Sequence, residues 1–184
     1  MTVRIRPLHP TIGAEVEGID MRRPLTADEV AAVEAGMDRH AVLVFHDQDI
    51  TDEQQVAFTV NFGPIELAIG GNITKPEERR IDVKLADVSN LDKDNQRLER
   101  NDRRRMAALG NRLWHSDATF RIVPARYSLL SGRITTTDGG NTEFADMRAA
   151  YDALDQATKN EIEDLVCEHS LIYSRGQLGF TDFT

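Results

Sequence analysis

The sequence predicts an α+β fold, and three observations carry this prediction. Residues 12–19 alternate small or apolar side chains with acidic ones, which is typical of a half-exposed strand ending in a turn. Thr26 and Thr51 are each followed, three residues later, by Glu or Gln, the signature of a capped helix start. Residues 125–131 alternate again, as a barrel strand does. Strands and helices are therefore both expected.

The first 64 residues are expected to form a packed start of the fold. After Thr26, apolar residues recur three to four apart as far as Ala41, which places them on one face of an amphipathic helix. Residues 41–45 are continuously apolar, as in a central strand covered on both faces. The helix that begins after Thr51 must stop at Gly63, which precedes a proline. These side chains are all expected to serve core packing.

Residues 65–110 differ in character from the rest. Gly70 and Gly71 open this stretch, charged residues dominate 75–105, and only 86–90 resemble a strand. A polar loop of this length inside a compact domain is usually either functional or disordered, and both alternatives are open. In a functional loop, Lys and Arg side chains would supply positive potential over an anionic small molecule. Otherwise they form a solvated, salt-bridged surface.

Regular structure is expected to return toward the C-terminal end. The sequence from Thr135 to Gly140 predicts a turn that supplies freedom at positive φ, followed by a short strand at 141–144. Asp146 and Asp155 are expected to cap two helices, the second reaching Leu165. Residues 168–173 are expected to form a further strand.

Composition excludes several classes of protein. The chain has 184 residues, 40% of them hydrophobic and 29% charged, which suits one soluble domain. The formal net charge of -9 argues against non-specific binding to nucleic acid or to an anionic membrane. No apolar run approaches the roughly 18 residues of a membrane span, and the N-terminus leads into no signal-peptide core, so a cytoplasmic location is expected. Cys167 follows Leu and Val and is expected to be a buried, inert thiol.

The stretch from Trp114 to Asp117 is the most suggestive of chemistry. On an extended segment, His115 and Asp117 point to the same face, so an imidazole nitrogen and a carboxylate oxygen can reach one ion. They would be two of the three ligands in a 2-His-1-carboxylate Fe(II) site. The pattern alone is weak evidence for a metal site. A His and an Asp at a strand end that only hydrogen-bond to each other or to water give the same sequence pattern. His169 is a tempting second imidazole, although a lone His on a strand is more often satisfied by the core or solvent.

Longer ordered runs carry a resemblance to a known family. The main ones are 42–48 (VLVFHDQ), 54–64, 114–120 (WHSDATF), 124–130 (PARYSLL), 139–152 (GGNTEFADMRAAYD), 168–170 and 179–180. They resemble the taurine dioxygenase superfamily of Fe(II)/2-oxoglutarate enzymes, and within it the 2,4-dichlorophenoxyacetate dioxygenases, particularly the alpha-type branch. The similarity runs along essentially the whole chain, and these motifs are far more specific than the His-x-Asp pair.

The resemblance implies a double-stranded β-helix, or jelly roll, with flanking helices. It makes His115 and Asp117 two iron ligands, and it makes Thr142, after the Gly-Gly turn, the threonine whose hydroxyl binds a carboxylate of 2-oxoglutarate. His169 matches no metal ligand of the family. The family's distal histidine ligand and its 2-oxoglutarate-binding arginine lie downstream, in the last strands of the jelly roll. Residues 1–184 are therefore expected to be one truncated dioxygenase domain, with a lid-like loop at about 65–110, inactive alone.

The implied activity uses Fe(II), 2-oxoglutarate and O2 to cleave the ether of phenoxyacetate herbicides such as 2,4-D. The products are a phenol and glyoxylate, with succinate and CO2 as co-products. The partner is then a small anionic aromatic substrate, for which Lys75 is the candidate contact and Lys84 a further loop cation. Two alternatives stay open: a family relative that oxidises a sulfonate, an alkyl sulfate or another small carboxylate, and a non-catalytic jelly-roll module. The oligomeric state is also open, a homo-oligomer included.

Overall fold

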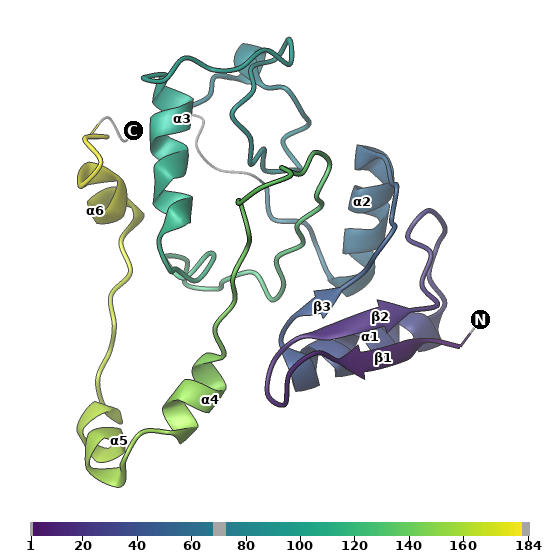
Figure 1. The fold of residues 1–184 in the computed structure, drawn as a ribbon. Helices are drawn as coiled ribbons and strands as arrows, with labels where there is room; N and C mark the ends of the chain where they lie inside the picture. The colour runs from purple at the N-terminus through teal and green to yellow at the C-terminus, as the bar shows by residue number, and fades with distance from the viewer. Residues whose placement is uncertain (1, 68–72, 182–184) are drawn as a thin grey trace. The chain divides into compact units, whose positions relative to one another are not determined.

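The computed structural model describes residues 2–67 and 73–181, which form two compact units (Figure 1). The first unit contains the chain up to Pro64 together with Leu129–Val166. The second contains Ile65–Ser128 and the chain from Cys167 on. Gly70 and Gly71, where the polar loop was expected to open, lie outside the described residues. Within the described part of the chain, no helix has both the length and the apolar character needed to cross a bilayer.

The first unit is built on a three-stranded sheet in the order β1-β2-β3. Strand β1 (Arg4–Pro7) pairs antiparallel with β2 (Ala14–Glu17), which confirms the strand predicted at 12–19. Strand β3 (Leu43–Val44) pairs in parallel with β2 and is shorter than the predicted strand at 41–45. Ala41 cannot belong to the strand, because its left-handed φ of 59° ends the preceding helix; Phe45 lies beyond the ladder, and its ring packs on Phe58.

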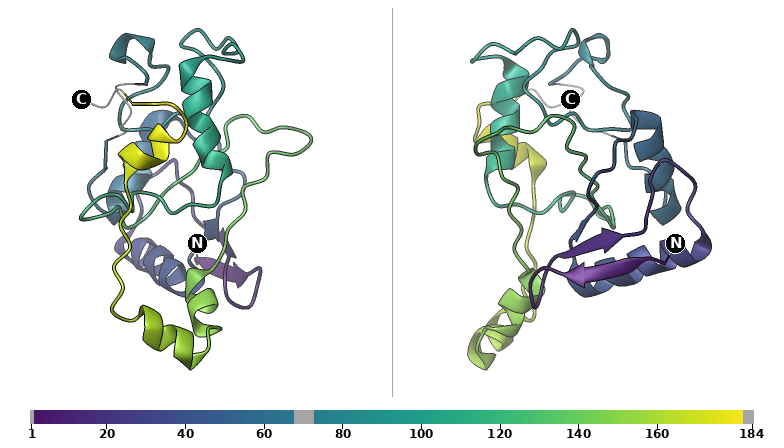
Figure 2. Two further views of the ribbon diagram at one scale, coloured as in Figure 1. Left: turned by 90° about the vertical axis from the view of Figure 1, so that its left-hand side faces the viewer. Right: turned by 45° about the vertical axis from the view of Figure 1, so that its right-hand side comes forward.

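Two helices complete this part of the first unit, and both begin as predicted. Helix α1 (Ala27–His40) starts at the capping box of Thr26 and Glu29, and it lies along one face of the sheet (Figure 2). Helix α2 (Asp52–Thr59) starts at the capping box of Thr51 and Gln54. It continues as a 3-10 turn, η1 (Val60–Phe62), which ends at Gly63. The buried centre between sheet and helices consists of Val16, Ile19, Val33 and Phe58.

Gly18 ends strand β2 in a conformation that only glycine adopts without strain. Its φ is +86°, and a Cβ at this position would lie 2.7 Å from the backbone oxygen of Thr2. We expect Gly18→Ala to lower the free energy of unfolding by about 1–3 kcal/mol from the backbone conformation, plus the cost of the clash. Denaturant unfolding measures the loss. Gly179→Ala is the matched control, because Gly179 has φ +84° and nothing within 4 Å of its Cβ position. An equal loss in both variants would show that the contact with Thr2 is unimportant.

Glu29 makes the folded state sensitive to acid. The buried carboxylate accepts a hydrogen bond of 2.9 Å from Arg23 and one of 2.8 Å from the Thr26 N–H. These bonds, Arg23 first, lower the pKa of Glu29 from 4.5 to about 2. The folded protein therefore holds this proton less tightly than the unfolded chain, so the stabilisation is present above about pH 4.5 and is lost as pH falls toward 2. We expect Glu29→Gln to flatten the pH dependence of the free energy of unfolding in this window. If the free energy of unfolding changed with pH in the same way in the parent protein and in the variant, Glu29 would not be the source of the acid sensitivity.

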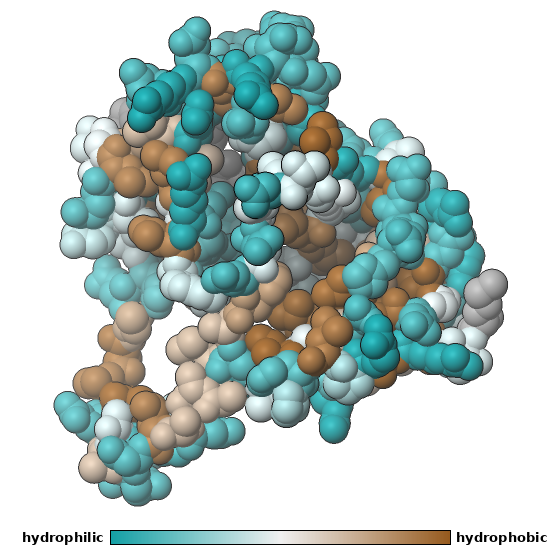
Figure 3. Space-filling view, viewed as in Figure 1, coloured by the Kyte–Doolittle hydropathy of each residue, from teal (hydrophilic) through white to brown (hydrophobic). Residues whose placement is uncertain are grey.

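The second part of the first unit carries two more capped helices. Helix α4 (Met147–Asp152) begins after Asp146, and helix α5 (Gln156–Ile162) begins after Asp155, as predicted. Helix α5 stops short of Leu165, and residues 141–144 form no strand. Figure 3 shows hydrophobic residues, in brown, at the surface of the molecule. Between residues 129 and 166, the exposed apolar side chains include Leu130, Ile134, Phe144, Met147, Leu165 and Val166.

The second unit consists of long irregular segments with short helical pieces. These are η2 (Pro76–Glu78), α3 (Arg103–Ala108), η3 (Leu109–Arg112) and α6 (Leu171–Gly176). The part from 73 to 102 is tied by ion pairs such as Arg80–Asp87, at 2.8 Å. The island at 86–90 that resembled a strand is irregular in the structure.

Two further strand predictions were wrong, and so was the burial of Cys167. Residues 125–131 run without a strand partner among the described residues, and a strand exists only where its backbone groups find one. Residues 168–173 turn into α6 because the Ser170 hydroxyl caps the helix by accepting from the Tyr173 N–H at 3.1 Å. Cys167 is exposed, and so are Leu165 and Val166, the apolar neighbours on which the predicted burial rested.

Candidate metal centre

The imidazole of His115 is oriented by the backbone two residues before it. Its Nδ1 lies 2.6 Å from the carbonyl oxygen of Leu113, in the second unit. A carbonyl oxygen only accepts, so Nδ1 carries the proton in this hydrogen bond. In the neutral ring, Nε2 then keeps its lone pair, which is the arrangement that metal-binding histidines use.

The carboxylate of Asp117 faces the same nitrogen. Its Oδ1 lies 3.3 Å from Nε2 of His115, and the two side chains are 60% and 46% exposed. Two donor atoms that bind one ion at about 2.1 Å in adjacent positions lie roughly 3 Å apart. Both atoms carry lone pairs, so a single cation within reach of both can be bound by both. The pair therefore fits two ligands of a divalent transition metal ion.

A tight turn follows Asp117 and directs the chain away from it. Ala118 has φ 57°, and the Arg121 N–H donates to its carbonyl at 3.0 Å. The sequence predicted an extended segment here, whereas in the structure residues 114–116 have no regular structure and a turn begins at Asp117. The turn was missed because left-handed φ values are usually signalled by Gly or Asn, and alanine gives no such signal.

No third ligand joins this pair within the part of the chain that the structure describes. No group of three His, Cys, Asp or Glu side chains suited to a metal ion occurs there. His169 lies in the same unit as His115 and Asp117. It is exposed and precedes α6. The metal-binding role of His115 and Asp117 stays a prediction, and the structure supports it by their geometry.

Thr142 lies in the first unit, beyond a glycine turn. Gly139 and Gly140 have φ values of 68° and 74°, so the turn predicted to need positive φ is confirmed. The Thr136 hydroxyl donates to the Gly139 carbonyl at 2.7 Å and closes the turn. Thr142 itself is exposed on an irregular segment. Its hydroxyl is thus accessible to a ligand.

Lys75 and Lys84 are exposed residues of the second unit. Lys75 precedes η2, where its N–H donates to Glu78 Oε2 at 3.4 Å. The N–H of Lys84 donates to Asp82 Oδ1 at 2.8 Å. Both side chains are free to reach an anion from solvent, which is a necessary feature of the role expected for Lys75.

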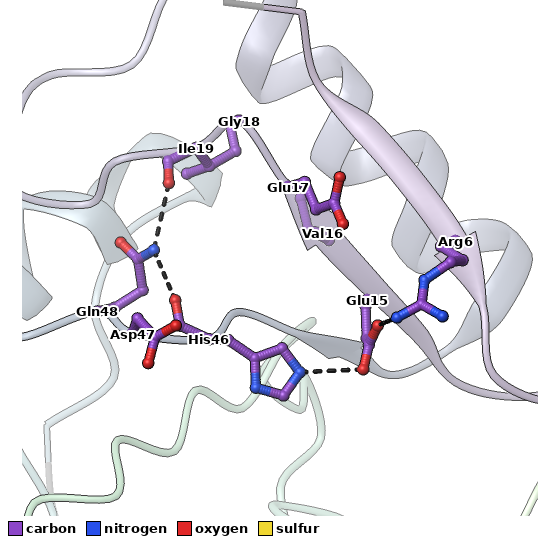
Figure 4. A pocket seen from close by; sticks show the side chains of 9 residues that line it. All are labelled: Arg6, Glu15, Val16, Glu17, Gly18, Ile19, His46, Asp47 and Gln48. Atoms are coloured by element: carbon purple, nitrogen blue, oxygen red, sulfur yellow. Dashed lines mark hydrogen bonds and ion pairs between the residues drawn. The ribbon is translucent and has the colours of Figure 1, made fainter.

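The first unit also contains a polar cavity of about 440 Å³ (Figure 4). Glu15 lines it, bound to Arg6 and, at 3.1 Å, to Nε2 of His46. Gln48 closes another side by donating to the carbonyls of Ile19 and His46 at 3.3 and 3.0 Å. No residue that the sequence marked for function lines this cavity.

Known proteins resemble this chain along its full length. It is 44% identical over 187 residues to the alpha-ketoglutarate-dependent 2,4-dichlorophenoxyacetate dioxygenase of Cupriavidus pinatubonensis (strain JMP 134 / LMG 1197), covering 100% of this chain and 64% of that protein. It is 36% identical over 180 residues to the (S)-phenoxypropionate/alpha-ketoglutarate-dioxygenase of Delftia acidovorans, covering 97% and 58%. The chain thus spans less than two thirds of the length of these relatives.

A solved structure gives the same result. The crystal structure of AAD-2 in complex with Mn(II) and N-oxalylglycine superposes with a TM-score of 0.92 at 60% identity, covering 100% of this chain and 64% of that one. The family described as "Taurine catabolism dioxygenase TauD, TfdA family" matches residues 4–183. The chain therefore belongs to the TauD/TfdA family of dioxygenases.

Proposed function

We propose that the complete protein containing this chain is an Fe(II)- and 2-oxoglutarate-dependent dioxygenase that cleaves the ether of aryloxyacetates such as 2,4-D. The observation that carries the proposal is the His115–Asp117 pair, in which Nε2 and a carboxylate oxygen lie 3.3 Å apart while Leu113 holds Nδ1. A relative of 44% identity named as a 2,4-dichlorophenoxyacetate dioxygenase supports it, as does a neighbour that holds Mn(II) and N-oxalylglycine.

The fold that we propose for the complete protein is an α+β jelly roll with flanking helices, forming a single dioxygenase domain. Residues 1–184 would supply the sheet β1–β3, two ligands and the polar segment at 65–110, which would act as a lid-like loop. The third ligand, a histidine, and the arginine that pairs with 2-oxoglutarate would come from the part of the relatives that this chain does not span. On this basis the chain alone is expected to be inactive.

Each candidate residue has a defined task in the proposed reaction. His115 and Asp117 hold the iron, which when bound activates O2 at the expense of 2-oxoglutarate. The Thr142 hydroxyl donates to a carboxylate of 2-oxoglutarate without adding charge. Lys75 attracts the carboxylate of the aryloxyacetate, so that the methylene beside the ether oxygen faces the metal. A misplacement of about 1 Å there could cost on the order of a hundredfold in rate.

The overall reaction balances. The aryloxyacetate, 2-oxoglutarate and O2 give a phenol, glyoxylate, succinate and CO2. One oxygen atom enters succinate, and the other enters the methylene beside the ether oxygen. The resulting hemiacetal breaks its bond between carbon and the aryl oxygen, and its hydroxyl proton passes to the phenol.

The partner in this proposal is a small aromatic anion. A net charge of -9 repels polyanions, so neither nucleic acid nor an anionic membrane surface is a partner. We place the protein in the cytoplasm, where an exposed, unbridged cysteine such as Cys167 stays reduced.

The test uses the protein encoded by the complete reading frame. Anaerobic titration with Fe(II) and 2-oxoglutarate is followed by the weak visible charge-transfer band of the chelate. Succinate and phenol release are then measured with an aryloxyacetate, a sulfonate and an alkyl sulfate. Succinate together with phenol supports the proposal. Succinate with the sulfur compounds alone indicates a family relative of different specificity, and the absence of both band and succinate indicates a non-catalytic module.

A further inference from the structure

Arg133 anchors the N-terminal end of the segment that carries Thr142 through hydrogen bonds. Its guanidinium donates to the carbonyl of Ile50, which is 5% exposed, and to side chains at the start of α2. The partners there are Asp52 Oδ1 at 3.2 Å and Gln55 Oε1 at 3.0 Å. Arg133 thereby joins this segment to a helix that lies about 80 residues earlier in the chain.

Arg148 anchors the C-terminal end of the same segment. It donates from Nη1 to the carbonyl of Asp38 at 2.8 Å and from Nη2 to that of Arg39 at 3.4 Å, both in the last turn of α1. A cation at a helix C-terminus is favourable, because the unpaired carbonyls there carry partial negative charge. Nε of Arg148 also donates to Asp146 at 3.2 Å, and this bond lowers the pKa of the Asp146 carboxyl, which caps α4.

Within the described part of this chain, few other contacts hold the segment between these two anchors. Residues 132–145 are all exposed, and the closing bond of the turn, from Thr136 to Gly139, is internal to the segment. A loop that buries little surface takes its position mainly from its fixed ends, and the freedom of the loop grows when an end is released. The position of the Thr142 hydroxyl therefore depends on contacts made six residues after it and nine residues before it.

We propose that Arg133 and Arg148 are positioning residues, which hold the Thr142 loop in the conformation that binds 2-oxoglutarate. The inference rests on the proposed function, because Thr142 has a ligand only if the protein binds 2-oxoglutarate. The hydrogen bonds of both arginines go to protein groups, most of them at the start of α2 and the end of α1. Each acts by reducing the conformational freedom that binding would otherwise have to remove.

The test compares Arg133→Gln and Arg148→Gln in the complete protein. The control is Arg22→Gln, since Arg22 lies in the same unit and is paired at 2.8 Å only two residues away, with Asp20. We expect both loop variants to weaken the binding of 2-oxoglutarate, followed by the charge-transfer band, about tenfold, the scale of a lost hydrogen bond to a charged group. Fe(II) content after anaerobic dialysis should change less than twofold. Arg148→Lys should restore part of the affinity, since an ammonium still donates to the α1 carbonyls.

Limited proteolysis and hydrogen exchange of the ligand-free protein separate positioning from general destabilisation. We expect both variants to be cleaved faster within residues 132–145 by a non-specific protease, because a released segment fits a protease more readily, while the amides of α1 and α2 keep their protection from exchange. Faster exchange in α1 and α2, or an unchanged affinity for 2-oxoglutarate in both variants, would overturn the inference. A parent protein that binds no 2-oxoglutarate would remove the proposed function, and the role of both arginines with it. Binding in the parent with no change in the variants removes the inference alone.

Discussion

Asp117→Ala in the complete protein is expected to abolish retention of Fe(II) and to lower kcat/KM for an aryloxyacetate by about a thousandfold. The loss follows because the carboxylate is the single anionic ligand proposed for the ion, and metal-assisted catalysis contributes several kcal/mol to the barrier. His115→Ala should act in the same way, since it removes the nitrogen that lies 3.3 Å from that carboxylate. Metal content after anaerobic dialysis and phenol release measure the two effects.

His169→Ala is the matched control for this prediction. It removes an exposed imidazole of the same unit that belongs to no three-residue cluster suited to a metal ion among the described residues. Metal content and turnover should match those of the parent protein. If His169→Ala lost the metal while His115→Ala kept it, the ligand assignment would be wrong.

Thr142→Val is expected to raise KM for the co-substrate, 2-oxoglutarate, by about ten- to a hundredfold with little change in kcat. Valine keeps the shape of threonine but removes the donor, and a hydrogen bond to a charged group is worth about 1.5–3 kcal/mol. KM for the aryloxyacetate should stay the same, because Thr142 is assigned to the co-substrate. Steady-state kinetics with each substrate varied in turn measures this separation.

Thr142→Ser tests whether the hydroxyl or the shape of the side chain is responsible. Serine keeps the donor and loses a methyl group, so KM for the co-substrate should stay close to that of the parent. Similar losses in the serine and valine variants would show that Thr142 serves packing. Its exposure in the structure argues against packing.

Helix starts were predictable from the sequence because they depend on bonds between close neighbours. The boxes at Thr26 and Thr51, and the caps at Asp146 and Asp155, each join groups no more than three residues apart. Strand β2 was also predicted, since alternation along it reflects one buried face.

A strand at 125–131 was predicted from the same alternation, and strands were also predicted at 141–144, after the glycine turn, and at 168–173; none occurs among the described residues. Alternation shows which side chains suit a sheet, but a strand needs a partner whose position is set by the rest of the fold. At 168–173 a local signal was overlooked as well, because Ser170 is a good helix cap. Cys167 was expected to be buried because its neighbours are apolar, but these neighbours, Leu165 and Val166, are exposed as well.

For the candidate site, sequence alone determined the residue types and their order: His115 and Asp117 two apart, and Thr142 beyond a glycine turn. Tertiary structure decided how they are held. Arg133 and Arg148 tie the Thr142 segment to helices about 80 and 110 residues away, whereas the bond from His115 to the Leu113 carbonyl is local. Backbone carbonyls carry no residue identity, and contacts over such separations leave no periodicity in the sequence. The candidate ligands could therefore be proposed from the sequence, whereas the anchors of the Thr142 segment were found only in the packing of distant segments.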